Sequence, residues 1–276
     1  MHNTRFFLQK YLLLSVLILV GWQGWTAVEA KKRPEVIVIH APDKPKSEKE
    51  ALMILPGLGD GKKGRKHQKE QFGNTTYDLY IPSFIDKHSF EGSVENLKKF
   101  YEVQELGRYR KVHVLSYILG SWVMNTFLKE FNPPNIATII YDRSPLQERA
   151  PRLISDKFPR IGKWYVGQVA LDLSEIAYPT IDKDDIRIGI LVESKATNIV
   201  KLFKKTVVGY GEVDWNKPDI RQQYNDLMYI ILDHDEMYAR LDVIRAELLT
   251  FIETGSFSEA AQRKPFSWDP FDRPKM

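Results

Sequence analysis

Seven short apolar runs recur along the chain, and they constrain its fold more than any other feature. They cover residues 34–39, 51–55, 77–81, 111–115, 136–141, 186–192 and 227–232. Continuous runs of this length, rich in Val, Ile and Leu, are typical of strands that are buried on both faces. Because helical segments alternate with the runs, we expect an α/β domain with a mostly parallel sheet and helices on both faces.

Helical spacing of apolar residues occupies three of the intervals between these runs. The expected helices cover residues 93–106, 119–131 and 238–254. Ser93 is the expected N-cap of the first helix, and Gly255 directly follows the last one. Each helix therefore has an apolar face to pack against the sheet.

One interval, residues 142–185, is too long for a simple connection and contains four prolines. A segment of this length is usually functional or forms a small cap. We therefore expect a lid at about 146–185, before the penultimate strand, with Trp164 and Tyr165 facing the pocket or a membrane.

The first thirty residues have the order of an export signal. Arg5 and Lys10 precede the uncharged run 11–20, and the segment ends at Ala30. This pattern predicts a signal peptide and a periplasmic or secreted protein. The alternative is an uncleaved membrane anchor at residues 5–28, since a span needs about 20 largely apolar residues. Residues 31–276 are then expected to form a single domain.

Composition and charge exclude several classes of site. The chain has no Cys, which excludes disulfides and Cys-ligated zinc, and its six His are not closely paired, so we expect no metal. A net charge of +4 is too small to predict nucleic-acid binding. No cofactor motif is present. One basic segment is expected to be a solvated helix face that could also meet an anionic membrane: Lys62, Lys63, Arg65, Lys66 and Lys69.

The carboxyl ends of the expected strands are where a parallel sheet binds ligands. A glycine-rich turn, ILPGLGDG, follows the strand at 51–55. The segment KVHVLSYILGSWV reads as strand, sharp turn and helix. His234 follows the last strand and precedes the last helix, and Asp142 follows the strand at 136–141.

In this order, these features resemble the α/β-hydrolase superfamily over residues 50–255. The resemblance implies that the ILPGLGDG turn is an oxyanion loop, with Gly57 and Gly59 freeing backbone amides and Leu58 as the best donor. It implies that His234 is the catalytic histidine or its remnant.

The nucleophile elbow of the superfamily has the pattern G-x-S-x-G. The resemblance places Ser116 on its first glycine, Ile118 on the nucleophile and Gly120 on its last glycine. An isoleucine side chain cannot form an acyl-enzyme.

The family's acid position falls on Thr197, which has no carboxylate. Glu193 is nearer the strand end and could take its place. Asp142 fits the variant in which the acid follows the preceding strand.

Three functions remain open. The favoured one is a non-catalytic binding protein that holds a small apolar or ester-like ligand, or a partner. Its pocket would be formed by Gly57, Leu58, Gly59, Ile118 and Leu119. The second is an ester or lipid hydrolase with a displaced nucleophile, for which the candidates are Ser116, Ser121 and Ser144. The third is a proton-transfer enzyme that uses His234 and an acid.

The export hypothesis predicts a mature amino terminus at Lys31. Amino-terminal sequencing of the protein from the extracellular or periplasmic fraction measures this directly. Full-length chain in the membrane would favour the anchor, and full-length chain in the cytoplasm would contradict both.

Overall fold

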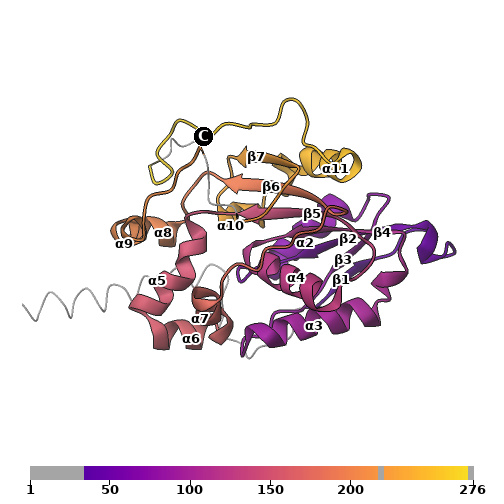
Figure 1. Cartoon of the computed structure of the whole chain (residues 1–276), viewed down its shortest axis with the longest axis horizontal. Coiled ribbons are helices and arrows are strands. Elements are labelled where there is room, and N and C mark those ends of the chain that lie inside the picture. The colour runs from indigo at the N-terminus through magenta and orange to yellow at the C-terminus, as the bar shows by residue number, and fades with distance from the viewer. Residues whose placement is uncertain (1–33, 217–220, 273–276) are drawn as a thin grey trace, which may run out of the picture. The chain divides into compact units, whose positions relative to one another are not determined.

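A seven-stranded sheet forms the centre of the molecule in the computed structural model, which describes residues 34–216 and 221–272 (Figure 1). The strands are β1 (Val36–Val38), β2 (Glu50–Leu55), β3 (Asp78–Ile81), β4 (Lys111–Ser116), β5 (Ile136–Arg143), β6 (Arg187–Glu193) and β7 (Asp226–Ile230). Their order in the sheet is β1-β3-β2-β4-β5-β6-β7. Only the β1–β3 pair is antiparallel among these neighbours. The predicted α/β class with a mostly parallel sheet is confirmed.

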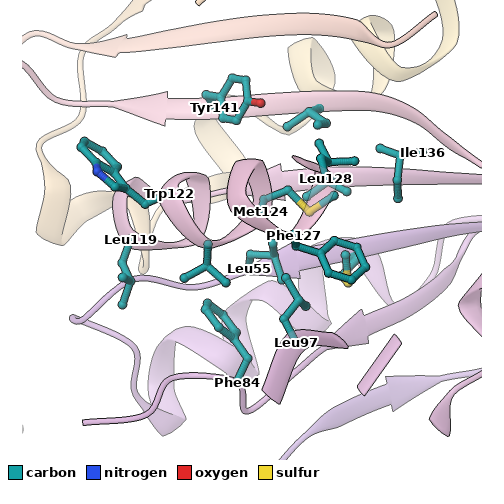
Figure 2. Close-up of a cluster of buried hydrophobic side chains, with 14 of the residues drawn as sticks. Leu55, Phe84, Leu97, Leu119, Trp122, Met124, Phe127, Leu128, Ile136 and Tyr141 are labelled. Atoms are coloured by element: carbon teal, nitrogen blue, oxygen red, sulfur yellow. The ribbon is translucent and has the colours of Figure 1, made fainter. Parts of the chain in front are cut away.

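Helices cover both faces of the sheet because alternate strand residues point to opposite sides. Met53 and Leu55 of β2 belong to the apolar cluster of α3 (Phe90–Val103) and α4 (Ile118–Phe131), part of which is drawn in Figure 2. Leu52 and Ile54 belong to the second cluster, which includes residues of α2 (Lys62–Phe72) and α11 (Arg245–Thr254).

The long interval between β5 and β6 is helical. It contains α5 (Ala150–Lys157), α6 (Pro159–Tyr165) and α7 (Gln168–Glu175). The backbone N–H of Phe90 donates to Asp172 Oδ2 over 3.1 Å, which ties α7 to the start of α3. Trp164 is 75% exposed, and the side chain of Tyr165 lies outside the described part of the chain. The lid role of this segment stays a prediction.

Three further α-helices are short. They are α8 (Asn198–Leu202) and α9 (Lys204–Gly209), which follow β6, and α10 (His234–Met237), which follows β7. None of the helices in residues 34–216 and 221–272 is long and apolar enough to cross a membrane. Residues 1–30, on which the signal and anchor hypotheses rest, lie outside the described residues.

Two of the predicted helix starts are wrong. Ser89 caps α3 instead of Ser93, because the Ser89 hydroxyl accepts the Gly92 N–H over 2.8 Å. The last helix begins at Arg245 instead of residue 238. The backbone N–H of Leu241 donates to His67 Nε2 over 3.1 Å, which takes it out of a helical hydrogen-bond ladder.

Gly120 allows α4 to approach β2 closely. A Cβ atom at this position would lie 2.5 Å from the Leu55 carbonyl oxygen. We expect Gly120→Ala to lower the free energy of unfolding by about 1–3 kcal/mol, because the backbone must shift to relieve this contact. Urea denaturation measures the change. Gly209→Ala is the matched control, since nothing lies within 4 Å of its added Cβ. Equal effects of the two substitutions would contradict the close approach.

Candidate functional site

The junction between β4 and α4 consists of Tyr117 alone. The strand ends at Ser116 and the helix begins at Ile118. The prediction that Ile118 stands at the tip of this turn is therefore wrong by one residue. Ile118 is the first residue of the helix, and it packs in the α3–α4 cluster with 9% of its surface exposed.

The turn also lacks the strain of a nucleophile elbow. Tyr117 has φ −74° and ψ 170°, an ordinary extended conformation. The non-glycine residues with positive φ in the described chain are Ala41, Glu105 and Asn132, all outside this turn. A strained turn is what exposes the nucleophile in G-x-S-x-G proteins.

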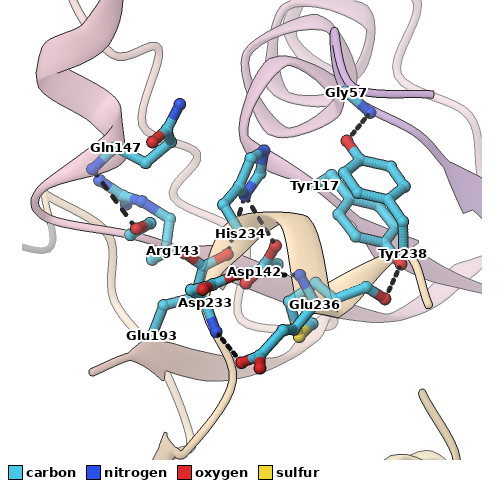
Figure 3. Close-up of polar contacts among 12 residues, drawn as sticks. Gly57, Tyr117, Asp142, Arg143, Gln147, Glu193, Asp233, His234, Glu236 and Tyr238 are labelled. Atoms are coloured by element: carbon cyan, nitrogen blue, oxygen red, sulfur yellow. Dashed lines mark hydrogen bonds and ion pairs between the residues drawn. The ribbon is translucent and has the colours of Figure 1, made fainter. Parts of the chain in front are cut away.

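Tyr117 is fully buried, and its hydroxyl is hydrogen-bonded away from His234. The hydroxyl donates to the Met237 carbonyl over 3.0 Å and accepts from Gln68 Nε2 over 3.3 Å. Its ring stacks on Tyr238 with the centroids 4.5 Å apart and the planes 9° apart. The Tyr117 and His234 rings meet edge to face at 6.4 Å (Figure 3). The two stacked tyrosines therefore fill the space beside the histidine.

The glycine-rich turn is packed against the same stack. The Gly57 N–H donates to the Tyr238 hydroxyl over 3.0 Å. A Cβ atom at Gly57 would lie 2.7 Å from this hydroxyl and 3.9 Å from His234 Nε2. At Gly59 it would lie 3.0 Å from the Tyr238 ring. The turn thus borders His234 as expected, but the Gly57 amide already has a hydrogen-bond partner.

Other residues assigned to the pocket have different surroundings. Leu119 is 1% exposed and belongs to the same apolar cluster as Ile118, while Leu58 is half-buried against that cluster. The role of the Leu58 amide as an oxyanion donor stays a prediction.

Three buried ionisable side chains meet at the ends of neighbouring strands (Figure 3). His234 Nδ1 lies 2.8 Å from Glu193 Oε1 and 3.7 Å from Asp142 Oδ2. Asp142 is 0% exposed, Glu193 is 1% exposed and His234 is 8% exposed. The two carboxylates that the sequence offered as alternative acids thus lie at one site.

Local structure fixes each member of this Asp142–Glu193–His234 cluster. Asp142 pairs with Leu191 near the carboxyl end of β5, and Glu193 pairs with Ile230 at the carboxyl end of β6. His234 opens α10, whose cap is Asp233: the Asp233 side chain accepts the Glu236 N–H, and the Glu236 side chain accepts the Asp233 N–H.

Thr197, at the acid position that the resemblance implies, has a partner other than the histidine. Its hydroxyl donates to Gln147 Oε1 over 2.6 Å.

The candidate serines have hydrogen-bond partners other than His234. Ser116 donates to the Ser121 hydroxyl over 3.3 Å, and Ser121 donates to the Tyr117 carbonyl over 3.1 Å. The Ser144 hydroxyl accepts the Gln147 N–H over 3.4 Å, and it also hydrogen-bonds to the Glu193 carboxyl, which lowers the pKa of Glu193. In the described part of the chain, the hydrogen bond of the His234 ring goes to Glu193, and no serine hydroxyl bonds to it.

Burial dominates the protonation of the cluster. It raises the pKa of Asp142 well above its usual range, the nearby Glu193 charge raises it further, and His234 opposes both effects. Burial likewise raises the pKa of Glu193, to which the charge of Asp233 adds. The pKa of Asp233 is raised to about 6, again mainly by burial. The Asp142–Glu193 pair therefore holds a proton at a pH where exposed carboxyls are ionised.

The basic segment that follows the glycine-rich turn is only partly a solvated face. Lys62, Lys63, Lys66 and Lys69 are exposed. Arg65 is 3% exposed and bonds to Asp60, with Nη2 2.7 Å from Oδ2. Arg65 is therefore a buried residue that is bonded to the glycine-rich turn through Asp60. The four lysines of the segment remain exposed for a surface interaction.

No protein-family model and no curated protein matches the chain. Solved structures that resemble it include a thermophilic esterase from Thermogutta terrifontis, with 12% identity, 81% of this chain and 99% of the other covered, and a TM-score of 0.46. An α/β hydrolase from the sediment metagenome of the Mar Chica lagoon, Morocco, has 17% identity, coverage of 76% and 94%, and a TM-score of 0.47. The third, 1H-3-hydroxy-4-oxoquinoline 2,4-dioxygenase, has 9% identity, coverage of 79% and 95%, and a TM-score of 0.46. The likeness is one of fold alone.

The buried carboxyl pair predicts an unusual pH dependence of stability. A carboxyl whose pKa is higher in the folded than in the unfolded chain stabilises the fold fully below its unfolded pKa, and this contribution is lost as the pH rises through the folded pKa. The pKa of Asp142 is raised well above 3.8, so the loss occurs above that value. We expect Asp142→Asn to be more stable than the wild type at pH 8, because asparagine occupies the same buried position without an ionisable proton.

This difference should shrink as the pH falls from 8 to 5, because the wild-type carboxyl then regains its proton. Urea denaturation at several pH values measures it. A difference between the two proteins that does not change with pH would contradict the raised pKa.

Proposed function

We propose that the protein is a non-catalytic binding protein with an α/β-hydrolase-like fold. It binds a small apolar or ester-like ligand at the carboxyl ends of the strands, and it does not cleave esters by a serine mechanism. The observation that carries this proposal is the position of Tyr117. The residue at the β4–α4 junction has its hydroxyl bonded to the Met237 carbonyl, whereas acyl transfer needs a nucleophile that faces the histidine.

The geometry of the glycine-rich turn supports the same proposal. Acyl transfer also needs backbone donors that are free to bind the developing oxyanion. The Gly57 amide donates to the Tyr238 hydroxyl, and Tyr238 lies against Gly59 as well. An ester carbonyl would have to displace this hydroxyl to reach the Gly57 amide.

A second candidate, proton transfer by His234, is favoured by one specific contact. The Nδ1–Glu193 hydrogen bond orients the imidazole, and it leaves Nε2 on the side of Gly57. An imidazole whose Nδ1–H is held by a carboxylate presents Nε2 as a base. Such a reaction needs no serine, and 10% of the His234 side chain is exposed.

Labelling with a fluorophosphonate probe tests the proposal. We expect no labelling of the wild type. Tyr117→Ser places a hydroxyl at the junction beside Gly57 and His234, and we expect this variant to gain weak labelling that His234→Ala abolishes. Ile118→Ser is the matched control and should stay unlabelled, because residue 118 is already in the helix.

Loss of a large buried side chain costs about 3–5 kcal/mol, so near-ultraviolet circular dichroism must show that Tyr117→Ser is folded. The labelling experiment on the wild type tests the proposal even if Tyr117→Ser does not fold. Stoichiometric wild-type labelling at Ser116, Ser121 or Ser144 that depends on His234 would overturn the proposal in favour of the displaced-nucleophile hydrolase.

A further inference from the structure

The Asp142–Glu193–His234 cluster has the composition of a metal site. Each residue offers one ligand atom, and the three atoms all lie within 4.8 Å of one another. The donors are one imidazole nitrogen and two carboxylate oxygens. Mixed nitrogen and oxygen donors of this kind suit Zn²⁺ and neighbouring divalent metals.

The Asp142 carboxylate is buried, with His234 Nδ1 3.7 Å from its Oδ2. Asp142 is 0% exposed, and neither of its carboxylate oxygens has a hydrogen-bond partner in the described part of the chain. Glu193 Oε2 is likewise without a partner there. A buried carboxylate without a partner is costly, and either a proton or a bound cation can neutralise it.

The nearest charged groups beyond the cluster leave its surroundings negative. Glu148 and Asp233 both act on Glu193 as negative charges. The nearby cations are already paired, with Arg143 Nε 2.6 Å from Glu148 Oε1 and Lys195 Nζ 2.8 Å from Glu236 Oε2. Such a potential favours a small cation over an anion or a neutral ligand.

We propose that Asp142, Glu193 and His234 bind one divalent transition-metal ion, of which Zn²⁺ is the type, through Nδ1 of the imidazole and one oxygen of each carboxylate. Coordination of the ion displaces the proton that lies between His234 Nδ1 and Glu193 Oε1. This inference goes beyond the proposed function and does not depend on it, because the site needs neither a serine nor a bound organic ligand.

The distances are compatible with coordination after small side-chain movements. Zinc bonds to nitrogen and oxygen are about 2.0–2.2 Å long, so tetrahedral ligand atoms lie ~3.4 Å apart. The His234–Asp142 distance of 3.7 Å is close to this value. The His234–Glu193 distance of 2.8 Å is that of a hydrogen bond and must lengthen by ~0.6 Å.

Isothermal titration of the full-length chain, without an affinity tag, with Zn²⁺ at pH 8 tests the proposal. We expect one ion per chain, with proton release that shows as a difference between two buffers. Binding should weaken as the pH falls to 5. Asp142→Asn, Glu193→Gln and His234→Ala should each weaken binding by at least about tenfold.

Two controls separate this site from adventitious binding. Asp235→Asn makes the same change beside His234 at an exposed position, and His88→Ala removes an exposed imidazole. Both should bind Zn²⁺ like the wild type. X-ray absorption of the zinc-loaded protein should show a nitrogen and oxygen shell at about 2.0–2.1 Å.

Absence of binding by the folded wild type at pH 8 would overturn the proposal and leave a proton as the neutralising charge. Equal binding by wild type and Asp142→Asn, each shown to be folded by circular dichroism, would overturn it as well.

Discussion

The stack of Tyr117 on Tyr238 is the contact on which the rest of the site depends. It borders both the glycine-rich turn and the histidine, and each tyrosine hydroxyl binds a backbone group. The Tyr117 hydroxyl binds the Met237 carbonyl, and the Tyr238 hydroxyl binds the Gly57 amide. Two buried rings in contact stabilise a fold through their large apolar area. Because both hydroxyls are hydrogen-bonded, their burial does not carry the free-energy cost of an unpartnered polar group. The same contacts occupy two groups that acyl transfer would use. These are the residue at the position of the nucleophile, Tyr117, and the backbone donor of the oxyanion loop, Gly57.

The second constraint is the meeting of three strand ends. In a parallel sheet the carboxyl ends of neighbouring strands lie side by side, so Asp142 and Glu193 come together although they are far apart in the sequence. Burial then makes the pair hold a proton or bind a cation. The buried cluster of a histidine and two carboxyls therefore needs a proton or a cation for neutralisation, whether or not a substrate is cleaved there.

Much of the fold could be predicted from the sequence because short apolar runs and helical spacing are local signals. The rule that sites lie at strand ends also located His234, Asp142 and Glu193. Local patterns could not show which residue of the sequence stands at the turn between β4 and α4. Assigning Gly120 to the last glycine of G-x-S-x-G shifted the turn by one residue, from Tyr117 to Ile118. Nor could they show that the Gly57 amide bonds to Tyr238, a contact between residues 181 positions apart.

We infer that the tyrosine stack excludes ester hydrolysis by a serine mechanism at His234. Turnover of a short-chain nitrophenyl ester by the wild type and by His234→Ala tests it most directly, because loss of a working triad member changes turnover by on the order of 10⁶. The account predicts equal, background rates for the two proteins. A wild-type rate well above background that His234→Ala removes would contradict it.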